Sequence, residues 1–220
     1  MHVSEHTIAI YADILCPWSH LAVYRLHSAR SRLGLDDVVG FDLRSWPLEV
    51  INRRPTPKLS LDAEIPVLAG LEPAAGWQMW SRKDHEYPVS SLLPLEAVQA
   101  AKEQGLGASA QLDRALRSAF FGRSRTVSLR HVVLDVAEAC DAVDASSLRD
   151  RLDSGRARAA VLEQLATDEV KGSPHLFLPD GTDAHNPGIE HHWEGDAGFP
   201  VIDRDEPIIY EDLLARAARP

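Results

Sequence analysis

The chain has 220 residues, of which 45% are hydrophobic and 25% charged, and its formal net charge at pH 7 is −10. This length suits one compact domain, or one fold that carries a large insertion. An acidic surface repels phosphate groups, so the charge argues against binding to nucleic acid and to anionic membranes. The sequence has no run of about 18 apolar residues and no signal-peptide pattern, so we expect a cytoplasmic protein.

The first predicted elements are a strand and a helix that meet at a cysteine. Residues 7–14 (TIAIYADI) alternate and are rich in β-branched side chains, which is typical of a strand. Cys16 follows with Pro-Trp-Ser, and residues 20–34 carry leucines near helical spacing. Residues 38–46 predict a second strand. This order predicts a parallel β-α-β unit.

A long helical region is predicted next. Residues 48–75 are rich in proline and short apolar pieces, which indicates a loop. From about 77 to 166 the helical period dominates, and the individual segments are 90–104, 109–121, 128–140 and 156–166. We expect Ser90 or Ser91 and Ser109 to act as N-caps.

The C-terminal part returns to strands. Residues 175–178 predict a strand, then a Pro-Asp-Gly turn and a short partner strand, and residues 199–203 predict another. Residues 206–219 predict a helix with acidic residues early and arginines late, as the helix dipole favours. Between these elements lie several potential zinc ligands, namely Asp183, His185, Glu190, His191, His192 and Glu194. Their spacing matches no standard zinc site, so we interpret the stretch as a polar loop.

The predicted element order is β-α-β, a helical block, then β-β-α. Neither flank completes a sheet alone, so the flanks are expected to form one α/β core. We therefore assign residues 1–75 and 167–220 to an α/β domain and residues 76–166 to an inserted helical domain.

Cys16 is the residue best suited to chemistry. At the junction of strand and helix it becomes the helix N-cap, with Pro17 at the first helical position. The free N–H groups and the positive end of the helix dipole favour the thiolate, so we expect a lowered thiol pKa and a nucleophilic sulfur. Ser19 lies one turn later and can donate its hydroxyl to the sulfur. The alternative is a small buried cysteine with no reactivity.

Neighbouring residues have weaker signals. We expect Trp18 to line a hydrophobic groove beside the sulfur, whereas His20 is turned about 100° further around the helix. Cys140 lies in an apolar helical segment, so we interpret it as a buried structural thiol rather than a resolving partner. A ligand cleft is expected between the helical block and the α/β core. The other tryptophans are expected in packing roles, at Trp46, Trp77, Trp80 and Trp193.

Three stretches resemble a known family: YADILCPWSHLA (11–22), residues 87–105, and VKGSPHLFLPDG (170–181). With the helical insertion, they are similar to the DsbA-like branch of the thioredoxin superfamily. That branch includes FrnE-type oxidoreductases, 2-hydroxychromene-2-carboxylate isomerases and kappa-class glutathione transferases. The resemblance covers nearly the whole chain and implies a thioredoxin fold with a helical insertion. It also implies that Pro174 is a cis-proline beside the cysteine, and that the Ser173 backbone can bind an extended peptide or a glutathione-like ligand.

The motif departs from this family at its fourth position, because redox-active members usually carry Cys-x-x-Cys and this chain has Ser19. A single thiol neither stores an internal disulfide nor releases its own mixed disulfide. We favour a monothiol thiol–disulfide oxidoreductase, with Cys16 and Ser19 as catalytic residues and an external thiol such as glutathione or mycothiol as co-substrate.

Two other functions remain open. One is a thiol-dependent isomerase or transferase, although those relatives carry serine at the position of Cys16. The other is a module without enzymatic activity that binds a peptide or partner. We expect the substrate, a small thiol or a disulfide-containing peptide or protein, to contact Pro17, Trp18, Ser173 and Pro174. No tightly bound cofactor and no metal are implied, and both a monomer and a homodimer fit the sequence.

Overall fold

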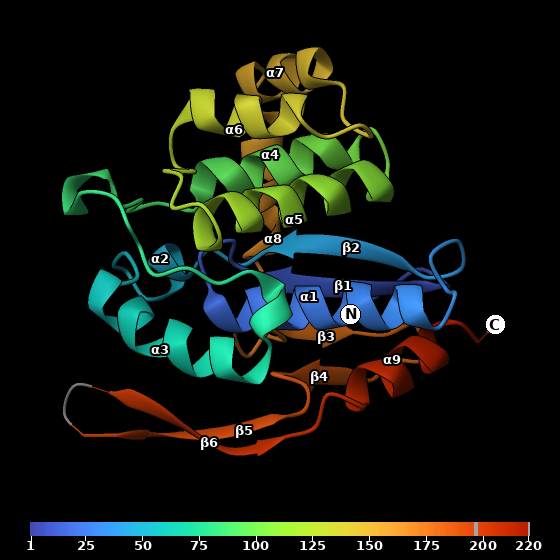
Figure 1. The fold of residues 1–220 in the computed structure, drawn as a ribbon. Coiled ribbons are helices and arrows are strands. Elements are labelled where there is room, and N and C mark those ends of the chain that lie inside the picture. Colours follow the sequence, from blue (N-terminus) through green and yellow to red (C-terminus); the bar gives the residue numbers. More distant parts are fainter. Residues whose placement is uncertain (196–197, 220) are drawn as a thin grey trace.

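The computed structural model describes residues 1–195 and 198–219, and its centre is a four-stranded mixed sheet (Figure 1). The strand order is β2-β1-β3-β4, in which β1 is parallel to β2 and antiparallel to β3, and β3 is antiparallel to β4. The strands are β1 (Thr7–Ala12), β2 (Gly40–Ser45), β3 (His175–Phe177) and β4 (Asp183–His185). The α/β architecture predicted from the sequence is confirmed.

Alternate residues of β1 face opposite sides of the sheet, as the pleat requires. Ile8 and Ile10 belong to the main core, together with buried residues of α1 (Pro17–Arg32) and α9 (Ile209–Ala217). Tyr11 contributes to a smaller cluster on the other face. The sheet is therefore buried on both sides, which suits the apolar sequence of its central strand.

A block of helices lies beyond the β2 edge of the sheet, at the top of Figure 1. It consists of α4 (Leu92–Lys102), α5 (Leu106–Phe121), α6 (Arg130–Glu138), α7 (Ala145–Asp153) and α8 (Arg156–Gln164). Below the sheet, β5 (Ile189–Glu194) and β6 (Phe199–Asp205) form an antiparallel hairpin that packs against α3 (Lys58–Leu71). Within the described residues, no helix is both long and apolar enough to cross a membrane.

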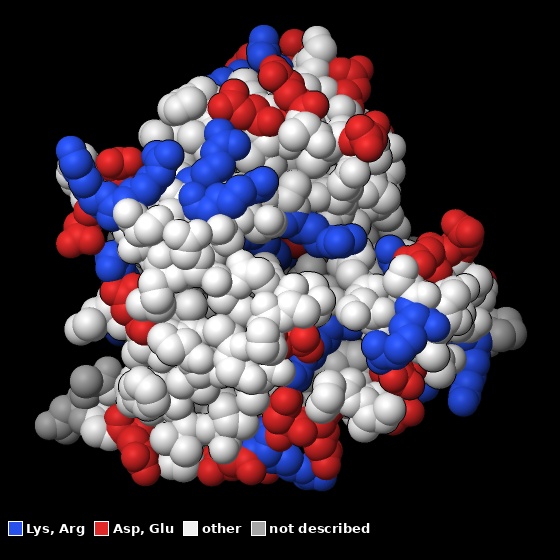
Figure 2. Space-filling view, in the orientation of Figure 1, with Lys and Arg blue, Asp and Glu red and all other residues white. Residues whose placement is uncertain are grey.

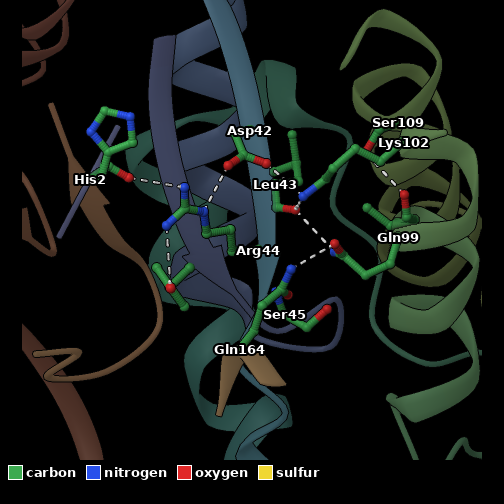
Figure 3. A network of polar contacts seen from close by, with 11 residues as sticks. His2, Asp42, Leu43, Arg44, Ser45, Gln99, Lys102, Ser109 and Gln164 are labelled. Atoms are coloured by element: carbon green, nitrogen blue, oxygen red, sulfur yellow. Dashed lines mark hydrogen bonds and ion pairs between the residues drawn. The ribbon is translucent and has the colours of Figure 1, made fainter. Parts of the chain in front are cut away.

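Side chains of the helical block hydrogen-bond to the edge of β2 that, within the described residues, pairs with no other strand of the sheet (Figure 3). The Leu43 carbonyl accepts hydrogen bonds from Lys102 Nζ at 2.6 Å and from Gln99 Nε2 at 3.0 Å. The Ser45 N–H donates to Gln164 Oε1 at 2.6 Å. Backbone groups that would otherwise be exposed at a sheet edge are thus satisfied by α4 and α8, which fixes the block to the core.

Three predictions of local structure were wrong. Residues 48–75 are not a loop, since they contain α2 (Leu48–Ile51), α3 and a 3₁₀ turn at Pro73–Ala75. Residues 189–194 are a strand rather than a polar loop, because their backbone pairs with β6. Ser109 lies inside α5 rather than at its start, and its hydroxyl donates to the Val98 carbonyl.

The charged residues are mixed on the face shown in Figure 2, where Lys and Arg side chains are interspersed with Asp and Glu. A broad uncharged area lies at its centre. A cavity lies between α1 and α5, and Arg114 and Arg117 are among its lining residues.

Candidate active site

Cys16 is the N-cap residue of α1, and Pro17 is the first helical residue. The cysteine is only 3% exposed, and its S–H donates to the main-chain carbonyl of Ser173 at 3.3 Å. The bond between Ser173 and Pro174 is cis. Two segments that lie 157 residues apart in the chain therefore meet at the sulfur.

The hydroxyl of Ser173 connects the two segments a second time. It lies 2.6 Å from the Ser19 hydroxyl and accepts a hydrogen bond from the Asp13 N–H at 2.9 Å. The short contact of Ser19 is thus with Ser173 rather than with the sulfur. Ser19 still lies close enough to Cys16 for its hydroxyl and its N–H to favour the thiolate. The hydrogen bond between the Ser19 and Ser173 hydroxyls fixes the Ser173 loop against the thiol.

Burial raises the pKa of the Cys16 thiol, contrary to the lowering expected from the helix N-terminus. Removal of the sulfur from water is the largest effect, because a thiolate is poorly solvated there. The negative charge of Glu64 acts in the same direction. The contacts with Ser173 and Ser19 oppose the rise without cancelling it. The resting group is a protonated thiol, so it must lose its proton within the site before it can attack.

The loop before the thiol is held by Asp13. Its carboxylate accepts hydrogen bonds from the N–H groups of Leu15 at 2.8 Å and Leu48 at 2.7 Å, and from the Ser91 hydroxyl at 2.9 Å. The Arg117 guanidinium donates to the Asp13 carbonyl at 2.9 Å. The helical block therefore supports the thiol through two residues, Ser91 and Arg117.

A cavity of about 350 Å³ opens beside Cys16. It is lined by the start of α1, by α2, by residues 52–57, by α3, by Ser173 and by Trp193 of β5. Within residues 1–195 and 198–219, none of its lining residues belongs to 76–166. The prediction of a cleft between the helical block and the core is therefore wrong for the thiol. The cavity between α1 and α5 does lie there, but Cys16 is not among its lining residues.

Trp18 forms one wall of the thiol cavity, as expected. Its ring stacks on His191 with centroids 4.3 Å apart and meets Trp193 edge-on at 6.4 Å. Trp193 was expected in core or interdomain packing, but it is 47% exposed and lines the thiol cavity. The hairpin thus contributes aromatic surface to the site.

Glu64 is a site residue that the sequence did not reveal. It lies on α3, lines the thiol cavity and is 8% exposed. Burial raises the pKa of its carboxyl to about 7, and a hydrogen bond from Trp18 only partly opposes this. The one available signal was the spacing of Leu61, Ile65 and Leu68, which marks an apolar helix face. Pro66 inside the segment obscured that signal.

His20 and Cys140 lie outside the thiol site. His20 stacks on Phe121 and hydrogen-bonds the Ala75 carbonyl at 3.0 Å, and burial lowers its pKa to about 3. Cys140 is buried in the core of the helical block, and its S–H donates to the Val136 carbonyl. Both cysteines are free thiols.

The expected polar loop does not gather its acids and histidines. Across residues 1–195 and 198–219, no group of three or more His, Cys, Asp or Glu side chains is arranged to hold a metal ion. Of this set, His192 lies 3.7 Å from Glu194, and its nearer partner is Asp203 at 2.9 Å.

The sequence profile of the DSBA-like thioredoxin domain matches residues 7–188. No curated protein matches the sequence. The cytosolic disulfide reductase DsbM from Pseudomonas aeruginosa, solved with glutathione, is 19% identical, with a TM-score of 0.61 over 79% of this chain and 86% of DsbM. SCO1869 from Streptomyces coelicolor, named a probable DsbA oxidoreductase, is 19% identical, with a TM-score of 0.65 over 96% and 89% of the two chains. A 2-hydroxychromene-2-carboxylate isomerase is also 19% identical, with a TM-score of 0.60 over 79% and 86%. These similarities show a shared fold.

Proposed function

Because the chain belongs to the DSBA-like thioredoxin domain family, we propose that it is a thiol–disulfide oxidoreductase that works with the single thiol of Cys16. The main support is the position of this sulfur, at the N-terminus of α1, beside a cavity and against the Ser173 carbonyl. A resolving thiol is missing from the motif, where Ser19 stands, and Cys140 is buried in the helical block. An external thiol therefore has to complete the reaction.

The proposed reaction has two steps. Cys16 loses its proton, and the thiolate attacks one sulfur of the substrate disulfide. A new S–S bond forms to Cys16, the substrate S–S bond breaks, and the departing half takes up a proton to become a thiol. The thiolate of the external thiol then attacks the substrate sulfur of the mixed disulfide. Cys16 leaves and is protonated again, so one cycle exchanges one partner of the substrate disulfide.

In this proposal the substrate lies along Trp18, Pro17 and the loop at Ser173–Pro174. While the sulfur is in a mixed disulfide it no longer donates to the Ser173 carbonyl, which is then free to accept an N–H of the substrate. A small disulfide or a disulfide-containing peptide would bind there as an extended segment. Glutathione and mycothiol are the external thiols that we propose, in the cytoplasm. Residues 76–166 would act as an inserted support for a domain made of 1–75 and 167–220.

The first test is to incubate the protein with oxidised glutathione at neutral pH and to map adducts by mass spectrometry. We expect a glutathione adduct on Cys16 that reduced glutathione removes. Cys16→Ser should abolish this adduct, and the matched control Cys140→Ser should retain it. An unmodified Cys16 in the folded protein, after exposure to oxidised glutathione and to bis(2-hydroxyethyl) disulfide, would refute the proposal.

A further inference from the structure

Glu64 is a buried acid without a cationic partner in the described part of the chain. Neighbouring charges are paired elsewhere, since Asp62 of the same helix binds Lys58 at 2.6 Å. Arg54 lines the same cavity, but among the described residues no cation contributes to the pKa of Glu64. An unpaired buried carboxyl is costly, so proteins rarely keep one without a use.

Glu64 and Cys16 share one environment. Both line the thiol cavity, and α3, which carries Glu64, packs beside α1, which begins after Cys16 (Figure 1). Leu68 of the same helix belongs to the cluster of buried residues that contains Cys16, so α3 lies directly beside the thiol. A thiolate next to a carboxylate is unfavourable, whereas a thiolate next to a carboxylic acid is not. The pair therefore favours a state in which one proton is shared between the two groups.

From this arrangement, and on the basis of the function proposed above, we propose that Glu64 is the acid–base residue of disulfide exchange. It takes the proton of Cys16 as the thiolate forms and gives that proton to the departing substrate thiolate. In the second step it takes the proton of the incoming thiol and returns it to Cys16. Each step moves one proton, so Glu64 ends each cycle as it began.

A purely structural role for Glu64 predicts different behaviour. Glu64 and Trp18 both line the thiol cavity, and a purely structural carboxyl would only orient the Trp18 ring. Glutamine has the same shape and keeps an oxygen acceptor, but it does not transfer a proton. Glu64→Gln therefore preserves the structural role and removes the chemical one.

The experiment compares two uncharged disulfides under single-turnover conditions. 4,4′-Dithiodipyridine releases a pyridinethiolate, whose charge the ring delocalises, so it departs without a proton. Bis(2-hydroxyethyl) disulfide releases a basic alkyl thiolate that needs one. In Glu64→Gln we expect the rate with the alkyl disulfide to fall about 100-fold. The rate with the aromatic disulfide should stay the same or rise, because removal of the negative charge lowers the Cys16 pKa. Asp62→Asn removes a charge from the same helix and should keep the wild-type ratio of the two rates.

The outcomes separate the two proposals. If both rates change by the same factor in Glu64→Gln, the acid–base role is refuted while the oxidoreductase function stands. If wild-type Cys16 reacts with neither disulfide, both proposals fail.

A second measurement needs no variant. In the wild type, the ratio of the alkyl to the aromatic rate should hold near pH 7, where Glu64 is ionised and takes the proton of Cys16. The ratio should fall at higher pH, where the pair has lost the shared proton and none is left to donate. The other groups that face Glu64 do not explain such a change. Cys16 affects both rates equally, burial keeps the hydroxyl of Tyr87 protonated, and Arg54 is a permanent cation. A ratio that does not depend on pH would refute the role of Glu64 even if the variant failed to fold.

Discussion

Replacement of Glu64 with glutamine should stabilise the protein at alkaline pH and have little effect at acidic pH. The folded protein raises the pKa of this carboxyl from 4.5 to about 7, so the folded state holds the proton more tightly than the unfolded state. Stability from this group is therefore fully present below about 4.5 and is lost as the pH rises to about 7. Above that range the wild type must bury a carboxylate, and the variant does not.

The size of the effect follows from the pKa difference. At about 1.4 kcal/mol for each tenfold change in proton affinity, burial of the Glu64 carboxylate costs about 3 kcal/mol. The advantage of Glu64→Gln in free energy of unfolding should grow from under about 1 kcal/mol near pH 5 to about 3 kcal/mol near pH 8. Urea unfolding at several pH values, followed by circular dichroism, measures this difference.

The control is Asp62→Asn, which should show the same pH dependence of stability as the wild type. A Glu64→Gln advantage that is constant across the pH range would refute the reasoning. It would mean that the carboxyl is solvated in the folded protein and that its interaction with Cys16 is screened.

Iodoacetamide should alkylate Cys16 more slowly in the folded than in the unfolded protein at neutral pH, because burial raises the thiol pKa; mass spectrometry after a timed quench measures both rates. Arg117→Met should lower the free energy of unfolding by about 3–5 kcal/mol in urea titrations, since it leaves Asp113 buried without its partner at 2.7 Å; equal stability would mean that water solvates Asp113. Ser19→Cys should form an internal disulfide with Cys16 and stop the mixed disulfide with glutathione from accumulating, as counted by mass spectrometry.

The junction around Cys16 was predictable because its signals are local. An alternating apolar segment predicts β1, and a proline directly after Cys16 marks the first turn of α1. Both signals depend on residues next to one another in the chain. The helix N-terminus also led us to expect a lowered thiol pKa, and this was wrong because the packing of α3 and the hairpin removes water from the sulfur.

The residues around the thiol were harder to predict because their roles depend on distant contacts. Glu64 resembles any acid on an amphipathic helix, and only the packing of α3 against α1 buries it. β5 alternates imperfectly and has four polar residues among six, so its pairing with β6 was not visible in the sequence. Asp13 follows a strand, where an acid commonly belongs to a turn. Its three hydrogen-bond donors come from positions 2, 35 and 78 residues later in the chain.

The hydrogen bonds of Asp13 limit which helical blocks could replace residues 76–166 in a chimera. One carboxylate binds the thiol loop, the start of α2 and the start of α4, so it sets the distance between the helical block and the thiol. A chimera that received residues 76–166 from another protein would have to bring a hydroxyl at the position of Ser91 and a guanidinium at that of Arg117. Without them, buried acceptors would lose their donors directly beside Cys16. The helical block therefore cannot be exchanged independently of the rest of the chain, because its position depends on one acid outside it.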